Sequence, residues 1–309
     1  MYHGLRRLIF ASLILLFLPW AIGLHLFGSS TLLEGTTAFV SVALSCVFVI
    51  LALVLMYPRV WWETVTTALV FGVVLMFMPV LEMVPELAPV ENREKVSVFV
   101  IFATLFGGFF LWLGLNWLPG ILMEIPLGLR EWRSRVHYDM PADQAFQVLK
   151  TSPDSDDGKY KTGPVGKDGL FTVSLSINSV NPDTWDPEAE DVLYKCKIEH
   201  EGPSQQVTSN FYMIEDEANV DVERLTVRAS GQGAVCETQA IRSRRNLYED
   251  LGFWLQDYGA DHLYGRLLMS EGRPSVALVD LPYVSPLFGL ARFFEQFNDD
   301  PPSPKGGKV

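Results

Sequence analysis

The sequence predicts an α+β protein: a four-helix transmembrane region, then a soluble domain in which an antiparallel sheet curves around a long C-terminal helix. Two features of its 309 residues predict this arrangement. Four apolar segments within residues 1–118 each have the roughly 20 residues that a helix needs to cross a bilayer. A series of alternating, strand-like segments then ends in a single helix-like stretch, residues 246–273.

The four apolar segments are residues 8–27, 37–57, 65–84 and 96–118. Basic residues set their orientation, because short cytoplasmic connections carry an excess of Lys and Arg. Two arginines precede the first segment, and Arg130, Arg133 and Arg135 follow the fourth. We therefore expect a multi-pass protein of the bacterial inner (cytoplasmic) membrane with both termini in the cytoplasm. A cleaved signal peptide is the alternative for the first segment, and it would leave the C-terminal half on the same side.

Charge excludes one class of partner. The chain has a net charge of −12, most of it in residues 129–309. An acidic soluble half argues against nucleic acid as a partner. Cys46, Cys196 and Cys236 share no close spacing, so the sequence predicts neither a metal site nor a disulfide framework. We expect no cofactor.

The soluble domain is expected to span residues 134–273. Residues 135–140 are typical of a short strand, and residues 141–150 of a helix with Pro141 near its first position. Five alternating segments follow, separated by turn signals: 169–180, 191–200, 206–214, 219–229 and 233–241. In the fourth of these, Leu225 and Val227 are one step out of phase with Val220 and Val222, which predicts a bulge.

Residues 246–273 are predicted to form one helix of about 25 residues, because apolar side chains recur at spacings of three and four. Asn246 followed by Glu249 resembles a capping box at its start. Gly272 and then Pro274 predict its end.

A strand, a helix, five or six antiparallel strands and a long last helix together resemble the START/Bet v 1-like helix-grip superfamily (SRPBCC), which includes polyketide cyclase/dehydrase-like proteins. The resemblance covers about residues 134–272, and it includes the helix start Pro-Ala-Asp-Gln-Ala-Phe at residues 141–146. It implies a seven-stranded sheet around the last helix, with a hydrophobic cavity between them. Members bind lipids, sterols or polyketides, and some are enzymes. The four membrane segments depart from the family and argue against a freely diffusing carrier.

Six positions on the predicted long helix are expected to line a ligand pocket: Gly252, Trp254, Leu255, Tyr258, Gly259 and His262. Glycine costs a helix about 1 kcal/mol relative to alanine, so Gly252 and Gly259 indicate either close packing against a strand or space for a ligand. His262 is a candidate acid or base, although a buried histidine is more often a hydrogen-bonded structural residue. No catalytic motif is present, so the catalytic residues stay unknown and binding is favoured over catalysis.

The segments that flank the soluble domain carry further predictions. Residues 119–133 are expected to form an interfacial linker, or a simple linker with positive charges. Residues 274–297 form an apolar extension that we expect to contact the membrane or the membrane helices, and residues 298–309 a disordered tail. Seven side chains are expected to face anionic headgroups, with a solvated strand end as the alternative for the last three: Arg130, Trp132, Arg133, Arg135, Arg242, Arg244 and Arg245.

Three functions remain open at this point. The favoured one is a cytoplasmic helix-grip domain that binds a hydrophobic ligand, lipid or polyketide-like, at the membrane. The alternatives are a cyclase- or dehydratase-type enzyme acting on a membrane-soluble substrate, and a structural accessory subunit of a membrane complex. The expected partners are the lipid bilayer, a hydrophobic small molecule and, for the last alternative, another membrane protein.

Overall fold

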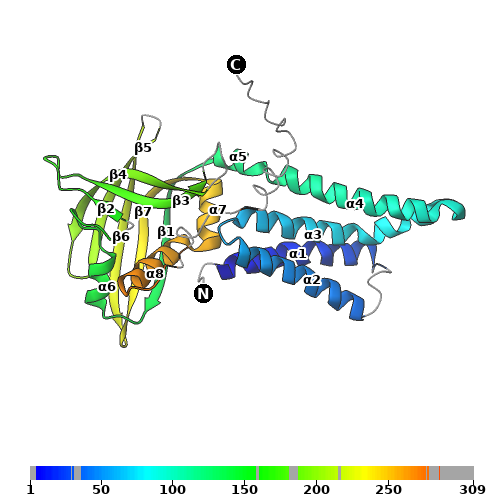
Figure 1. Cartoon of the computed structure of the whole chain (residues 1–309), viewed down its shortest axis with the longest axis horizontal. Helices are drawn as coiled ribbons and strands as arrows, with labels where there is room; N and C mark the ends of the chain where they lie inside the picture. Colours follow the sequence, from blue (N-terminus) through cyan, green and yellow to red (C-terminus); the bar gives the residue numbers. More distant parts are fainter. Residues whose placement is uncertain are drawn as a thin grey trace, which may run out of the picture.

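The computed structural model describes residues 5–28, 30, 36–157, 160–180, 187–214, 217–275, 277 and 285. Among these, a helical bundle and a sheet domain lie end to end, with a short helix, α7, between them (Figure 1). Most of the predicted apolar extension and the whole predicted tail fall outside the described residues.

The bundle contains four helices that are long and apolar enough to cross a membrane, as predicted. They are α1 Leu5–Phe27, α2 Thr36–Met56, α3 Trp61–Met83 and α4 Arg93–Leu115. The 3-10 turns η2 Pro85–Leu87 and η3 Val90–Asn92 join α3 to α4. Helices α1 and α3 approach closely because Gly72 has no side chain; a Cβ there would lie 2.6 Å from the Leu15 carbonyl oxygen.

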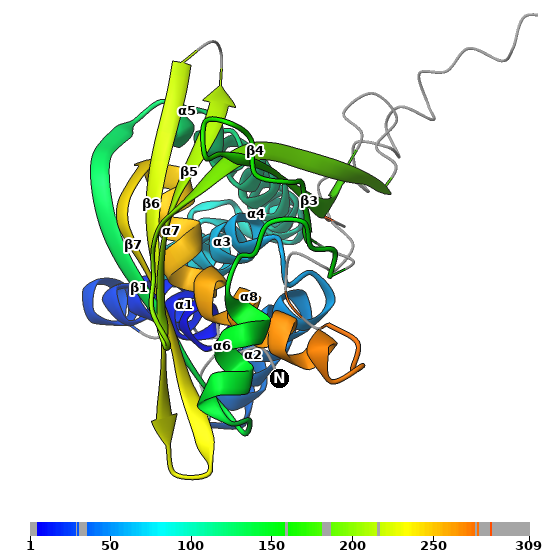
Figure 2. The same cartoon turned by 90° about the vertical axis from the view of Figure 1, so that its left-hand side faces the viewer.

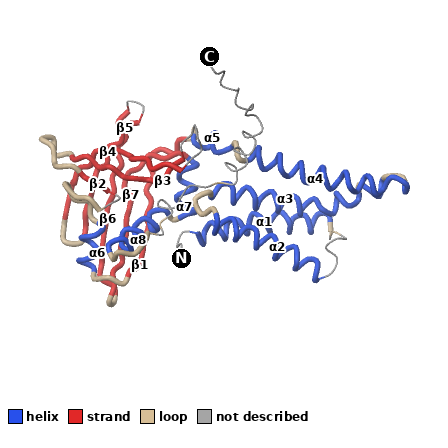
Figure 3. Tube along the Cα trace, in the orientation of Figure 1, coloured by secondary structure: helices blue, strands red, loops and turns tan. Residues whose placement is uncertain are grey.

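The sheet has seven antiparallel strands in the order β1-β7-β6-β5-β4-β3-β2. Its curved face encloses helices α7 and α8, while α6 covers the lower end (Figures 2 and 3). This arrangement confirms the predicted α+β, helix-grip fold. The elements are α5 Leu118–Met123, β1 Pro126–Tyr138, α6 Ala142–Leu149, β2 Tyr160–Thr162, β3 Phe171–Val180, β4 Pro187–Glu201, β5 Gln205–Ile214, β6 Glu217–Ser230, β7 Gly233–Asn246, α7 Leu247–Gln256 and α8 Tyr258–Ser270.

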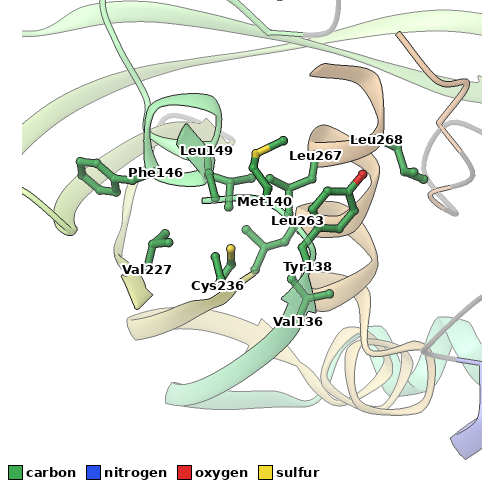
Figure 4. Close-up of a cluster of buried hydrophobic side chains, with 12 residues drawn as sticks. Val136, Tyr138, Met140, Phe146, Leu149, Val227, Cys236, Leu263, Leu267 and Leu268 are labelled. Atoms are coloured by element: carbon green, nitrogen blue, oxygen red, sulfur yellow. The ribbon is translucent and has the colours of Figure 1, made fainter. Parts of the chain in front are cut away.

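The core of the domain lies between α6, α8 and strands β1, β6 and β7. Phe146 and Leu149 of α6 meet Leu263 and Leu267 of α8, and Val136 of β1 closes the cluster (Figure 4). Burying such side chains contributes about 1.5–3 kcal/mol each. These side chains fill the space between α6, α8 and the sheet at this end of the domain.

The bulge predicted in β6 is wrong, because the extra residue lies in β7. Val222 pairs with Arg242 and Glu223 with Ala240, so β7 advances two residues where β6 advances one, while β6 pairs with β5 without interruption. Glu223 faces inward by ordinary alternation with Leu225 and Val227. The regular alternation of β6 thus places a carboxylate inside the domain.

The predicted single long helix is wrong: it is two helices, broken at Asp257. Asp257 has φ +43° and ψ +47°, a left-handed conformation that ends α7 and that aspartate tolerates better than most residues. Two partners hold its carboxylate. Ser134 Oγ donates to Asp257 Oδ1 at 2.9 Å, and Arg7 of α1 lies 3.5 Å from Oδ2. The capping box at Asn246 is present as predicted.

The predicted linker at residues 119–133 contains instead α5 and the first half of β1. Pro126 pairs with Asn246, and Arg133 pairs with Gln239, so the sheet starts eight residues earlier than expected. Two register shifts interrupt this half of the strand, between Pro126 and Leu129 and between Arg130 and Trp132. The first shift adds a residue to β1 and breaks its alternation of side chains, so the sequence pattern conceals the start of the strand; the second adds a residue to β7.

Described residues of the predicted extension touch the rest of the chain at α8 and at α3. Ala277 lies against Gly265 of α8, where an added Cβ would be 2.7 Å from the Ala277 Cβ. Ser285 Oγ donates a hydrogen bond to Glu63 at the start of α3. At Ser285 the chain after the domain therefore contacts one of the four apolar helices.

Candidate functional site

A cavity of about 230 Å³ lies between the inner face of the sheet and helix α8. Strands β1 to β7 all contribute to its wall, and α7 and α8 close it on the other side. The cavity begins where the packed core of Figure 4 ends, at Leu149 and Leu263, which belong to both. Position and enclosure make it the candidate ligand site.

Six aromatic side chains form much of the wall: Trp132, Tyr160, Tyr194, Tyr212, Phe253 and Tyr258. The rings are in contact with one another; the Tyr194 and Tyr212 centroids are 4.8 Å apart, and the Phe253 and Tyr258 centroids 5.0 Å. Burial raises the pKa of Tyr194 and of Tyr212, so both phenols stay protonated. The wall therefore offers flat apolar surface together with neutral hydroxyl groups.

The floor of the cavity is polar. Gln206, Thr208 and Asn210 of β5 are buried and point into it. Gln206 is fixed by two hydrogen bonds of 2.8 Å with the backbone of Thr151. The family resemblance implied a hydrophobic cavity. In the structure, however, the alternate residues of β5 that face the cavity are the polar ones. A ligand here needs hydrogen-bonding groups as well as apolar surface.

One carboxylate faces the cavity from β6. Burial raises the pKa of Glu223 to about 7; the nearby Asp221 carboxylate acts in the same direction, and the Arg245 guanidinium opposes it. Asp221 itself accepts a hydrogen bond of 3.1 Å from Ser243 Oγ. Glu223 is therefore close to half-ionised at neutral pH, unlike an exposed glutamate.

Arg245 and Trp132 are inside the domain, so their predicted role at the membrane surface is wrong. The Arg245 guanidinium lies 3.4 Å from the Phe253 ring centroid and 4.8 Å from that of Trp132. Burial lowers the pKa of Arg245, while the nearby acids oppose that shift. Trp132 faces inward because it alternates in phase with Ser134 and Val136, the buried residues that follow it in β1. Trp132 Nε1 and Arg245 Nη1 are buried without a hydrogen-bond partner among the described residues.

The opposite wall carries a histidine and a second arginine, both from α8. The Tyr160 hydroxyl and His262 Nε2 are 2.5 Å apart and hydrogen-bonded. Arg266 lies 4.9 Å from the Tyr160 ring centroid and donates to the carbonyl oxygens of Leu149 at 2.8 Å and Val148 at 2.9 Å. These bonds tie α8 to α6 and to β2, and they orient His262 toward the cavity.

Of the six predicted pocket positions, Tyr258, Gly259 and His262 lie on the cavity wall. Gly259 also packs tightly on β1, where an added Cβ would lie 2.7 Å from Ser134 Oγ. Gly259 therefore both packs closely against a strand and lines the cavity, the two roles that its place in a helix indicated. All three residues belong to α8.

The other three predicted pocket residues belong to α7, and they do not line the cavity. Leu255 packs in a cluster with Leu5 and Leu8 of α1 and Trp61 of α3. Gly252 faces the Trp61 indole, where a Cβ would lie 2.7 Å from Nε1, and the Trp254 side chain is 59% exposed. The break at Asp257 explains the difference, because α7 turns its buried face to the bundle and α8 turns its own to the sheet.

Four of the remaining predicted surface residues are exposed. Arg130, Arg133 and Arg135 are exposed on β1, and Arg133 pairs with Glu237 at 3.2 Å. Arg242 is exposed on β7, and the Arg244 side chain lies outside the described part. Contact of these arginines with headgroups stays a prediction.

Sequence reasoning missed Glu223 and the three strand tyrosines. A signal for Glu223 was present, since it alternates in phase with the apolar Leu225 and Val227, which face inward. Within the described ranges, the structure has no group of three His, Cys, Asp or Glu residues that could hold a metal ion.

The fold defines a helix-grip domain joined to four apolar helices. No family model and no curated protein matches the sequence. Among solved structures, the chain is similar to protein MLL2253 from Mesorhizobium loti, with 12% identity over 46% of this chain and 97% of that one, and a TM-score of 0.34.

Two further solved structures are similar to this chain. Protein Ms6760 from Mycobacterium smegmatis has 12% identity over 47% of this chain and 99% of its own, with a TM-score of 0.31. The di-domain ARO/CYC BexL from the BE-7585A biosynthetic pathway has 10% identity over 59% of each chain, with a TM-score of 0.27.

Proposed function

We propose that this protein is a membrane-anchored binding module whose sheet domain holds a small amphipathic molecule in the cavity between the sheet and α8. The observation that carries the proposal is the cavity itself, with aromatic walls and a polar floor. Flat apolar surface together with a few fixed polar groups is the usual composition of a small-molecule site. Because the floor is polar, a ligand with polar groups fits better than a plain hydrocarbon chain.

The four apolar helices support the membrane part of the proposal. Exposed apolar residues cover α4, including Phe99, Phe102 and Phe106, as expected of a helix that faces lipid. The basic residues near the first and fourth segments favour a cytoplasmic sheet domain at an inner membrane. A ligand that partitions into the bilayer would then be concentrated next to the domain.

The test is the identity of the small molecules that purify with the full chain. We expect an organic extract of the wild-type protein, analysed by liquid chromatography and mass spectrometry, to contain a stoichiometric amphipathic compound. Thr208→Phe should abolish its retention, because Thr208 is 7% exposed and points into the cavity. Thr172→Phe, on the exposed face of β3, is the matched control and should retain the compound. Equal retention by both variants, or none by the wild type, contradicts the proposal.

A second candidate function is catalysis of the cyclase or dehydratase type on a membrane-soluble substrate. It is favoured by a carboxyl of pKa about 7 that shares one cavity with the hydrogen-bonded pair of Tyr160 and His262. A group that titrates near neutral pH is suited to general acid–base work. Once a bound compound is known, Glu223→Gln should abolish its conversion at saturating substrate; unchanged turnover removes Glu223 from this role.

A further inference from the structure

We propose that the cavity selects a ligand that carries a protonated amine on a compact aromatic or similar apolar body, with the amine beside the Glu223 carboxylate. The inference rests on the proposed binding function and names the class of its ligand. Three features carry it: the balance of buried charge, the position of the tyrosines, and the partners of Glu223.

The charged groups at the cavity compensate one another, with one exception. Arg266 forms an ion pair with Asp157 at 3.3 Å and two hydrogen bonds to backbone carbonyls. Arg245 lies next to Asp221, under the rings of Phe253 and Trp132. Glu223 is the additional acid, and no described residue donates a hydrogen bond to its carboxylate. The wall therefore carries one carboxylate that a ligand can satisfy.

A buried carboxylate without a hydrogen-bond donor is costly, and an ammonium group supplies both the opposite charge and the missing donors. Tyr194 and Tyr212 line the same cavity as Glu223, and burial and the Glu223 charge both raise the pKa of the two phenols. Neutral phenol rings attract a cation through their faces, so the same tyrosines stabilise an amine that Glu223 holds.

Trp132 lines the wall, and its Nε1 has no hydrogen-bond acceptor among the described residues. A hydroxyl oxygen on a ligand that reaches this donor would satisfy it without adding negative charge. A carboxylate at that position would repel Glu223 and Asp221. The opposing possibility is an anion held by Arg245 Nη1 and Arg266 Nε, which also have no partner among the described residues, and a carboxylate probe tests it.

Binding of an amine should depend on pH. The groups that surround Glu223 are Asp221 on its own strand, Arg245 on β7, Tyr194 and Cys196 on β4, Tyr212 on β5, Tyr160 on β2, and His262 and Arg266 on α8. Below pH 7 the carboxyl of Glu223 is mostly protonated and must lose its proton before it can hold a cation. Affinity should therefore rise with pH, by about tenfold between pH 6 and pH 8.

The experiment uses the full chain in a nonionic detergent and three probes of one shape: phenethylamine, 2-phenylethanol and phenylacetate. Dissociation constants are measured by calorimetry at pH 6, 7 and 8. At pH 8 we expect the amine to bind about tenfold or more tighter than the alcohol, and phenylacetate to bind most weakly. Glu223→Gln should equalise amine and alcohol and flatten the pH profile, whereas Glu223→Asp, which keeps the charge, should keep the preference for the amine.

Other results overturn the inference. If 2-phenylethanol or phenylacetate binds the wild type at least as tightly as the amine, the ligand class is wrong while the cavity remains a binding site. If His262→Gln flattens the pH profile and Glu223→Gln does not, the amine is held by another group. If none of the three probes binds and the purified protein is empty, the binding function fails together with the ligand class. Thermal melting of each variant verifies that it is folded.

Discussion

Replacing Gly259 with alanine is expected to lower the stability of the sheet domain by about 3 kcal/mol, one of the two largest effects that we predict for a single substitution. An added Cβ would lie 2.7 Å from Ser134 Oγ and 2.8 Å from Trp132 Cη2. Trp132 cannot retreat easily, because Phe253 and Arg245 pack on its ring. Either α8 moves off β1, or the indole is pushed into the cavity.

Denaturant unfolding followed by tryptophan fluorescence measures the loss. Gly265→Ala is the control on the same helix, because the atoms that its Cβ would meet belong to Ser275 and Ala277, beyond the end of α8, and not to the sheet. We expect the control to lose less than half as much stability. A Gly259→Ala protein that is as stable as the control would show that α8 does not press on β1 in this way.

Trp61→Ala is the second substitution with a large expected effect, and it acts on the joint between the two parts of the protein. Trp61 is 5% exposed, and it fills the space that Gly252 leaves on α7. Its ring centroid also lies 4.9 Å from that of Tyr248. Truncating a buried tryptophan costs about 3–5 kcal/mol, so the packing of α7 on α3 should be lost and α7 should be held more loosely to the bundle.

Hydrogen–deuterium exchange over residues 247–256 reports this loss, and we expect exchange there to accelerate by two orders of magnitude or more. Trp254→Ala is the matched control, since the Trp254 side chain lies on the same helix and is 59% exposed. It should change the exchange rates little. Equal acceleration in both variants would mean that Trp61 does not hold the domain to the bundle.

The sequence predicted the elements that depend on local patterns. The four apolar helices, the alternating strands and the capping box at Asn246 all follow from spacing and residue type, and the structure contains them. These features need no knowledge of distant parts of the chain.

The errors arise where distant residues decide the outcome. The break at Asp257 depends on Ser134 and Arg7, which are 123 and 250 positions away in the sequence and which no helical periodicity reveals. Once the helix is broken, Gly252, Trp254 and Leu255 leave the cavity, and the bundle covers the face that would otherwise have met the sheet.

The candidate site was predicted only in its helical half. Tyr258 and His262 follow from periodicity, whereas Glu223, Tyr194 and Tyr212 lie on strands whose inner face depends on the exact register. In β5 the polar set of alternate residues faces inward, against the usual expectation for a buried sheet face. The register of the strands, more than their composition, therefore determines which side chains face the cavity.

The most direct test of a ligand-holding cavity is photo-crosslinking in intact membranes. Tyr212→p-benzoylphenylalanine places the photoreactive group on the cavity wall, and Thr172→p-benzoylphenylalanine places it on the exposed face of β3. After irradiation, we expect mass spectrometry to show one discrete small-molecule adduct on the peptide that contains position 212 and none at position 172. No adduct at position 212, or the same mixture of adducts at both positions, would contradict a cavity that holds a specific ligand.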